Sequence, residues 1–170
     1  PKVQAGFGPL VEGFVRVPMN DLAAVEAVAR SNPNVVAVFL ETIQGEGGIN
    51  IPRAGWLARC AAICRKHNVL LIADEVQTGL GRTGALLCCD HDGVRPDLLT
   101  RGKALSGGFY PVSAVVADRK VLGLLRPGDH GSTFGGNPLG SAIARAALSV
   151  LIDEGLVERS REVGAYFKGR

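Results

Sequence analysis

The chain has 170 residues, of which 46% are hydrophobic and 21% are charged, and its formal net charge at pH 7 is +3. This length fits one domain with a real apolar core, while the small, scattered positive charge and the few aromatic residues argue against nucleic acid as a partner. No apolar run reaches the span of a membrane helix and no signal-peptide pattern is visible, so we expect no membrane partner and a cytoplasmic location.

Helical and strand-like segments alternate along the chain. Asn20-Asp21 is predicted to cap a first helix, which Asn32-Pro33-Asn34 ends. Residues 35–40 and 69–73 are unbroken apolar runs, typical of strands that are buried on both faces, and a helix that follows Pro52-Arg53 separates them. This order predicts an α/β fold with a mainly parallel sheet and helices packed on it.

The second half of the chain continues the pattern with shorter elements. We expect two short strands, at 97–100 and 111–117, and two helices, at 139–152 and 153–167. A loop at 127–138, rich in glycine and hydroxyl groups, precedes the helices. No internal repeat or clear linker divides the chain, so a single domain is predicted.

Polar residues follow the predicted strands at their carboxyl ends, where ligands gather in α/β sheets. Glu41 and Asp74 each end an apolar run, and Lys103 follows the third strand between glycine-rich turns. A lysine and an aspartate so placed suit pyridoxal 5′-phosphate (PLP), because the amine forms a Schiff base with its aldehyde and the carboxylate keeps its ring nitrogen protonated. The alternatives are a strand-end helix cap or a metal ligand for Asp74, and a surface lysine for Lys103.

Lys103 does not match a nucleotide phosphate loop. Ala104 follows it where such a loop has serine or threonine, and the required glycine spacing is absent. Its apolar neighbours, Leu99, Ala104 and Leu105, are expected to bury the amine in part. Partial burial disfavours the charged form and so favours the neutral, nucleophilic amine.

Two further segments offer hydrogen-bond donors to a cofactor. Gln77 lies three residues past Asp74 and is a candidate donor to a cofactor oxygen, with ordinary turn chemistry as the alternative. Residues 131–138 present hydroxyls and backbone N–H groups just before a helix, as a phosphate site requires. An ordinary loop is the alternative for that segment.

The sequence contains four cysteines in two close pairs: Cys60 with Cys64, and Cys88 with Cys89. The first pair is one helical turn apart and the second is adjacent in sequence. Neither spacing matches a zinc site, so we predict no metal. We expect reduced thiols that serve as small apolar residues in a reducing compartment.

Three ordered motifs resemble those of the class III aminotransferases. They are IADEVQTGLGRTG at 72–84, GKALSGG at 102–108 and HGSTFGGNP at 130–138, and the likeness covers nearly the whole chain. Within the class, the sequence is most similar to the ornithine aminotransferases, with the acetylornithine aminotransferases next. The resemblance implies PLP as cofactor and part of the aspartate-aminotransferase fold (fold type I), a mainly parallel sheet with helices on both faces.

The resemblance also implies roles for individual residues around the cofactor. Lys103 would hold the cofactor and then move a proton between the substrate Cα and the cofactor carbon. Asp74 would bond the ring nitrogen. Val76 would press on the ring face, and Gln77 would contact the ring hydroxyl.

Other implied roles involve the substrate and a second subunit. Glu46 would lie near the substrate and pair with an arginine from a later part of the family's chain. Ser132 and Thr133 would reach the cofactor phosphate of a neighbouring subunit, which implies a homodimer with shared active sites. The sequence departs from the family at Thr42, where proline is usual, and at Arg101, where an apolar strand residue is usual.

The family's chains are more than twice as long as this one, which begins at Pro1 without methionine and stops at Arg170 inside a helical pattern. We therefore expect residues 1–170 to be part of the PLP-binding large domain, with about 154–170 leading toward a small domain, and to be inactive alone. The implied activity transfers the δ-amino group of ornithine to 2-oxoglutarate, giving glutamate 5-semialdehyde and glutamate. Transamination of acetylornithine and a non-catalytic, truncated PLP-fold protein are the alternatives.

Overall fold

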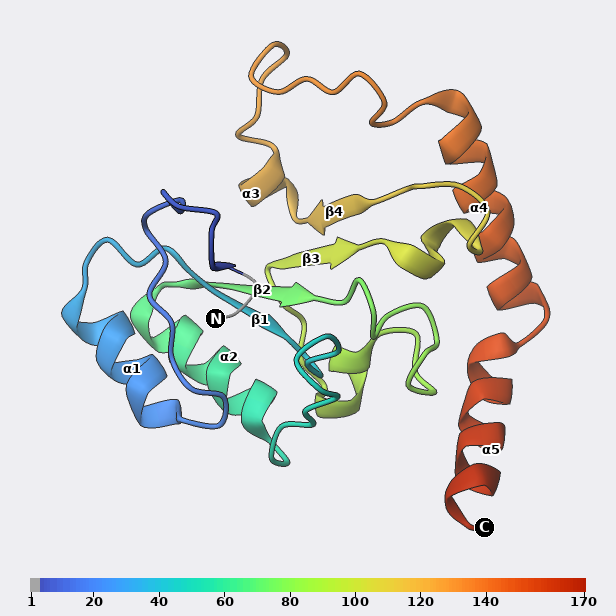
Figure 1. Cartoon of the computed structure of the whole chain (residues 1–170), viewed down its shortest axis with the longest axis horizontal. Helices are drawn as coiled ribbons and strands as arrows, with labels where there is room; N and C mark the ends of the chain where they lie inside the picture. The colour runs from blue at the N-terminus through green and yellow to red at the C-terminus, as the bar shows by residue number, and fades with distance from the viewer. Residues whose placement is uncertain (1–3) are drawn as a thin grey trace.

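The computed structural model describes residues 4–170 and contains every predicted helix and strand, with ends displaced by a few residues (Figure 1). The strands are β1 (Ala37–Glu41), β2 (Leu70–Asp74), β3 (Leu98–Arg101) and β4 (Ala114–Ala117). The helices are α1 (Leu22–Ser31), α2 (Trp56–His67), α3 (Arg119–Leu122), α4 (Pro138–Asp153) and α5 (Leu156–Lys168), with two short 3-10 helices, η2 (Cys88–Asp92) and η3 (Lys103–Ser106).

The four strands form one sheet in the order β1-β2-β3-β4. The first three run parallel, which confirms the mainly parallel sheet, and β4 runs antiparallel to β3 at the edge. A parallel β4 would need a long crossover, whereas only η3 and a loop connect it to β3. In the parallel part, Asp74 lies opposite Glu41 on one side and Thr100 on the other, so the carboxyl ends of these strands meet at one edge.

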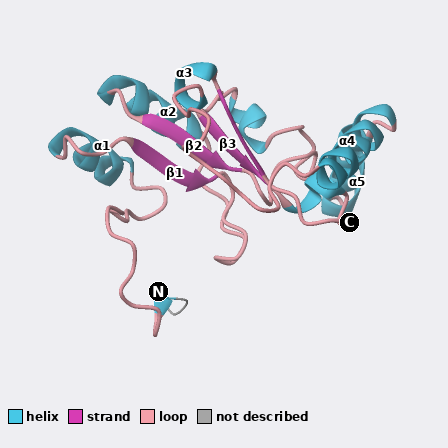
Figure 2. Ribbon diagram, turned by 90° about the horizontal axis from the view of Figure 1, so that it is seen from above, coloured by secondary structure: helices cyan, strands magenta, loops and turns pink. Residues whose placement is uncertain are grey.

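Helices α1 and α2 lie side by side against one face of the sheet (Figure 2). The predicted cap of α1 is confirmed, because the Asp21 carboxylate accepts a hydrogen bond from the Ala24 N–H at 2.9 Å. Side chains alternate along β1: Val38 and Leu40 pack into the core under the helices, while Phe39 on the opposite face is 56% exposed. The core therefore lies between α1, α2 and one face of the sheet.

The C-terminal helices pack at the far end of the sheet. Helix α4 lies against η3, and Gly155, in the left-handed conformation with φ 62°, separates it from α5. Helix α5 packs beside the loop that follows β2, where the Arg161 side chain donates from Nε to the Gly84 carbonyl at 3.0 Å. Within residues 4–170, no helix has the length and apolar character needed to cross a membrane.

Candidate active site

Asp74 is the last residue of β2, so its side chain leaves the sheet at the carboxyl edge. It is half-buried, and its Oδ1 accepts the Val76 N–H at 2.9 Å. That bond caps a turn and not a helix, because residues 76–79 form turns. Among residues 4–170 no hydrogen bond is recorded to the second carboxylate oxygen, Oδ2, which leaves an acceptor for a ligand.

Lys103 opens η3 directly after β3, with a backbone φ of 43°. This left-handed conformation is uncommon for a residue other than glycine and costs about 1 kcal/mol, and such strain concentrates at functional sites. The prediction that apolar neighbours bury the amine is wrong: Lys103 and Ala104 are exposed, whereas Leu105 and Ser106 are buried. The cause is the sharp turn of η3, which directs successive side chains out of and into the sheet edge.

Lys103 and Val76 line the same cavity, whose volume is about 390 Å³. Its other walls are Gly102, which immediately precedes Lys103, and four residues of the segment between η3 and β4, namely Tyr110, Pro111, Val112 and Ser113. Gly102 approaches Val76 so closely that a Cβ there would lie 3.3 Å from Val76 Cγ1. A larger residue before Lys103 would therefore fill the space between the valine and the lysine.

The turn after Asp74 also approaches the glycine-rich loop that follows β1. The Gln77 amide group lies against Gly45, where a Cβ would overlap it unless the glutamine side chain moved. The Thr42 and Thr78 hydroxyls lie 2.8 Å apart in a buried hydrogen bond that joins the same two segments. The threonine that replaces the family's proline thus has a definite partner.

The buried carboxylate of Glu75 is a feature that the sequence analysis did not single out. Glu75 is 1% exposed, and its two oxygens accept the Cys88 and Cys89 N–H groups at 2.7 Å each. The Thr78 hydroxyl donates to Oε2 at 3.4 Å. The position of Glu75 in the sequence could have indicated this role. It is a second acidic residue directly after a buried strand, and a buried carboxylate needs hydrogen-bond partners of its own.

The four cysteines are buried free thiols, as predicted. Burial raises the pKa of Cys60 to about 12 and that of Cys64 to about 11. The two vicinal cysteines of η2 also have raised pKa values, again mainly because of burial. Such thiols are poor nucleophiles at neutral pH, so the cysteines are structural.

The structure does not bring all predicted site residues to the Lys103 cavity. Glu46 is exposed on the loop next to Gly45, near the Gln77 turn. Ser132 and Thr133 are also exposed, on the long loop between α3 and α4 that extends away from the sheet (Figure 1). The Ser132 hydroxyl accepts the Gly135 N–H at 2.8 Å, which shapes this loop locally.

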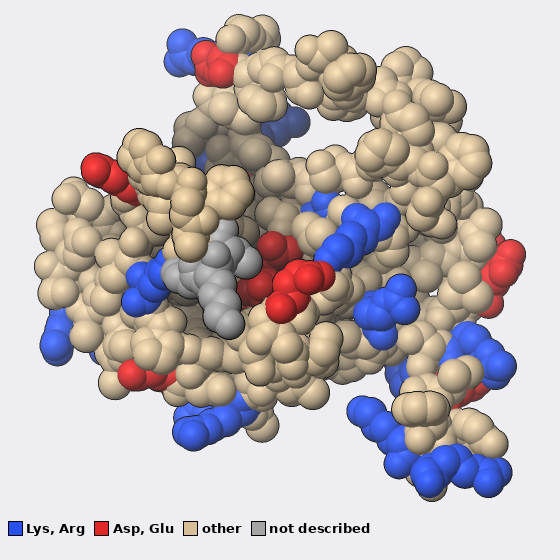
Figure 3. Space-filling view, in the orientation of Figure 1, with Lys and Arg blue, Asp and Glu red and all other residues tan. Residues whose placement is uncertain are grey.

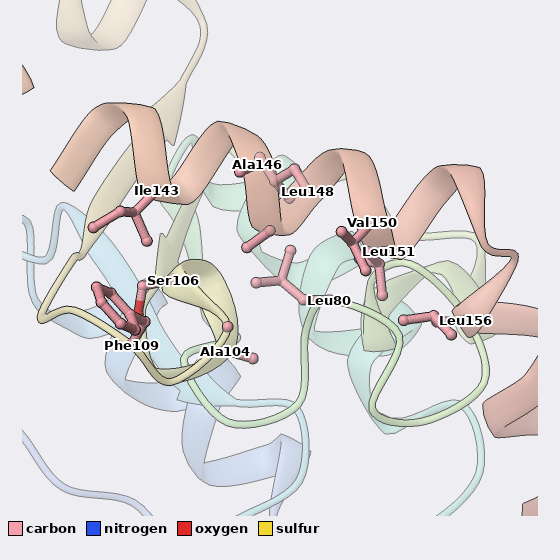
Figure 4. Close-up of a pocket in the computed structure, with 12 residues that line it drawn as sticks. Leu80, Ala104, Ser106, Phe109, Ile143, Ala146, Leu148, Val150, Leu151 and Leu156 are labelled. Carbon is pink, nitrogen blue, oxygen red and sulfur yellow. The ribbon is translucent and has the colours of Figure 1, made fainter. Parts of the chain in front are cut away.

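A second cavity, of about 460 Å³, lies between α4 and the η3 turn (Figure 4). Its walls are almost entirely apolar, with Leu80 and Phe109 facing Ile143 and Leu151 of α4. On the face shown in Figure 3, charged side chains are scattered, with basic ones gathered toward α5. Among residues 4–170, those that line the second cavity include no acidic or basic side chain.

Comparisons with known proteins agree with this geometry. The family model described as aminotransferase class III matches residues 1–170, and the chain belongs to that family. Ornithine aminotransferase 2 of Staphylococcus saprophyticus is 54% identical over 168 residues, which are 99% of this chain and 42% of the relative. The chain thus spans less than half the length of that protein.

Two solved structures are also similar to this chain. The ornithine aminotransferase of Toxoplasma gondii, described as having partial occupancy of PLP at its active site, superimposes with a TM-score of 0.95 and 51% identity, over 99% of this chain and 39% of that one. The acetylornithine aminotransferase of Elizabethkingia anophelis gives a TM-score of 0.90 and 52% identity, over 96% of this chain and 41% of that one. The predicted fold, that of PLP-dependent aminotransferases, is confirmed by these neighbours, of which this chain covers a part.

Proposed function

We propose that this chain is the central part of the PLP-binding domain of an ornithine aminotransferase, which transfers the δ-amino group of ornithine to 2-oxoglutarate. The observation that carries the proposal is the shared cavity of Lys103 and Val76, with Asp74 at the end of the adjacent strand. The identity to ornithine aminotransferase 2 of S. saprophyticus, 54%, supports the choice of substrate.

The residues at the carboxyl edge fit PLP. Lys103 is exposed and lines the cavity, as attachment to an aldehyde requires, and Val76 lines the same cavity, whose volume of about 390 Å³ can accept a planar ring. Asp74 has a carboxylate oxygen without a protein hydrogen bond among the described residues, which suits a ring nitrogen. When bound, PLP supplies an electron sink for the charge left when a substrate C–H bond breaks.

Each side chain then has a definite task. Lys103 Nζ binds the cofactor aldehyde and carries the proton that moves to and from the substrate carbon. Asp74 holds a proton on the ring nitrogen through a charge-assisted hydrogen bond. Val76 fixes the ring plane from one face, and Gln77 donates to the ring hydroxyl.

The proposal extends to a second subunit and to the substrate. We infer that Ser132 and Thr133 bind the cofactor phosphate of a partner subunit in a homodimer, because their loop is exposed and remote from the cavity of its own chain. Glu46, exposed beside the Gln77 turn, faces the amino-acid substrate. These contacts require a partner subunit and parts of the enzyme outside residues 1–170. We therefore expect that residues 1–170 alone do not transaminate.

We further infer that all of the described chain belongs to the large domain, with residues 154–170 leading toward a small domain. The hydrogen bond from Arg161 to Gly84 supports this, because it ties α5 to the loop after β2. Four free thiols support a reducing compartment such as the cytoplasm.

Borohydride reduction of the holoenzyme that contains this segment, followed by peptide mapping, tests the proposal. Reduction makes the bond between the lysine and the cofactor permanent, so the pyridoxyl label marks the attached residue. We expect the label on the peptide that contains Lys103. Label on another lysine, or none, would overturn the assignment.

Acetylornithine is the second candidate substrate, because the E. anophelis acetylornithine aminotransferase is 52% identical to this chain. Initial rates with ornithine and with N-acetylornithine separate the two possibilities. We expect a higher kcat/KM with ornithine, and the reverse order would establish the alternative without affecting the Lys103 assignment.

A further inference from the structure

Arg101 is the charged last residue of β3, and it lies two residues before Lys103. Its guanidinium Nη1 is buried and has no hydrogen-bond partner among residues 4–170. The same is true of the hydroxyl of Thr100, the preceding residue. Two successive buried polar groups without hydrogen-bond partners cost free energy in a strand. A favourable electrostatic interaction of the arginine would offset part of this cost.

The surroundings of Arg101 supply such an interaction. Nη1 reaches the Cα of Gly79 so closely that a Cβ on that glycine would collide with it, and the same Cβ would lie 3.3 Å from Glu75 Oε2. The guanidinium and the buried carboxylate are therefore neighbours at one point of the 75–79 turn. Burial lowers the pKa of Arg101, and the negative charge of Glu75 acts in the opposite direction. An arginine remains charged under these conditions, so a positive charge lies beside the buried acid.

Glu75 needs this charge because its own partners are neutral. Its carboxylate is 1% exposed and is held by the N–H groups of Cys88 and Cys89 and by the Thr78 hydroxyl. These donors satisfy its hydrogen bonds but do not neutralise it. A buried charge with a nearby counter-charge is much less costly than one without.

We propose that Arg101 is a positioning residue: its half-buried guanidinium lies near the Glu75 carboxylate without a direct ion pair, offsets its charge, and so helps to hold the 75–79 turn, which carries Val76 and Gln77, in place beside Lys103. The consequence for catalysis rests on the proposed function, because it assumes that Val76 and Gln77 contact the cofactor. The structural part does not, since the turn and the arginine are in contact whatever binds there. Arg101 itself does not touch the Lys103 cavity.

Hydrogen–deuterium exchange of the holoenzyme that contains this segment tests the proposal, with three variants. Arg101→Met removes the charge at similar volume, Arg101→Lys keeps it, and Arg95→Met is the matched control. Arg95 is a surface arginine, 84% exposed, whose pair with Asp118 at 2.7 Å lies outside the site. We expect amides 75–79 to exchange roughly tenfold faster in Arg101→Met, and at nearly the wild-type rate in the other two.

Cofactor affinity is the second measurement, since a loosened turn should raise the PLP dissociation constant of Arg101→Met several-fold and that of Arg101→Lys much less. Amide exchange at 75–79 that is unchanged in Arg101→Met would overturn the proposal. The proposal would also fail if the amides of α1 and α2 exchanged faster by the same factor as those of 75–79, because that result would indicate a general loss of stability. Exchange in Arg101→Lys as fast as in Arg101→Met would also overturn it.

If Arg101→Met does not fold, Glu75→Gln replaces it, because this variant removes the negative charge and leaves the arginine in place. Faster exchange at 75–79 is again expected, and no change overturns the proposal. The result does not depend on the cofactor. If borohydride labels a lysine other than Lys103, the proposed function fails, while the exchange data still decide whether Arg101 holds the turn.

Discussion

Two regions of the molecule use their apolar residues in different ways. The segment from α1 to β3 contains a packed core, in which Leu57 is 3% exposed and Cys60 and Ala73 are fully buried, although Phe39 on the other face of the sheet is exposed. After Lys103 they are mostly at the surface, where Leu139 is 58% exposed and Phe167 is 81% exposed. The first region therefore has its own core, whereas the second presents apolar surface that we expect to be covered by other parts of an assembled enzyme.

Lys103 lies where these two regions meet. Asp74, Glu75 and Val76 belong to the packed region, and the wall of the cavity opposite Val76 comes from the segment before β4. The cavity therefore has walls from both the packed region and the less packed region. The predictions below separate contributions of chemistry from contributions of packing.

The largest effect is expected from Lys103→Ala in the holoenzyme. In the proposed function both cofactor attachment and proton transfer depend on this amine, so transamination should fall by about a thousandfold or more. The fold should survive, because the lysine is exposed. Initial rates with ornithine, together with far-ultraviolet circular dichroism, measure the two parts. Activity within about tenfold of the wild type would show that another residue does this work.

Asp74→Asn should have the next largest effect. The substitution keeps the shape and the hydrogen bond from the Val76 N–H but removes the charge that holds a proton on the ring nitrogen. We expect the chemical step to slow by about 3 kcal/mol, roughly a hundredfold. Single-turnover half-reactions with ornithine measure this step directly, and near-normal rates would contradict the role of Asp74.

A pair of leucine substitutions tests the difference in packing. Leu57→Ala, in the packed face of α2, should lower the free energy of unfolding by about 3 kcal/mol because it leaves a cavity in the core. Leu139→Ala, on exposed α4, should change it by less than about 0.5 kcal/mol. Urea unfolding of both variants gives the values. Equal losses would mean that the second region is as tightly packed as the first.

The pH dependence of stability should reflect the buried thiols, which all lie in the packed region. Burial raises the pKa of Cys60 from 9.0 to about 12 and that of Cys64 to about 11. Between pH 9 and these values, the unfolded chain releases protons that the folded chain retains, so stability falls as pH rises. The slope is at most about 1.4 kcal/mol per pH unit for each thiol.

Urea unfolding at pH 8 and pH 10 measures this decline in the free energy of unfolding. Cys60→Ala is the control, because it removes the contribution of one thiol and should make the decline smaller. Stability that is equal at the two pH values would show that the thiols are accessible in the folded chain. It would also weaken the distinction between the two regions.

Much of this arrangement was predictable from the sequence. The unbroken apolar runs before Glu41 and Asp74 identified parallel strands, and the residues at their carboxyl ends identified the candidate site. The short connection between β3 and β4 already favoured an antiparallel β4, whereas the exposure of Lys103 depends on how the short η3 segment turns the chain. Periodicity reports which residues are apolar, but it carries no information on a single sharp turn.

The contacts of Glu75 and Arg101 could not be predicted from the sequence, for a related reason. A buried carboxylate is satisfied here by the backbone of Cys88 and Cys89, 13 and 14 residues away, and by a charge from another strand. Backbone donors have no signature in the sequence. Long-range polar contacts of this kind are therefore visible only when the strands are placed side by side.

The smallest effect on stability is expected from Phe109→Ser, at the border of the second region. Phe109 is 82% exposed although it lines the apolar cavity between η3 and α4 (Figure 4), so its loss should change the free energy of unfolding by less than about 0.5 kcal/mol. Leu105→Ser is the matched control: Leu105 lies four residues earlier, in η3, and also next to this cavity's wall residues Ala104 and Ser106, but it is 8% exposed, and a hydroxyl there should cost about 2 kcal/mol or more. Binding of an apolar fluorescent dye to residues 1–170 should decrease in Phe109→Ser, because the cavity loses an exposed aromatic wall. A large loss of stability with unchanged dye binding would mean that Phe109 is part of a closed core, and the second region would then be as self-contained as the first.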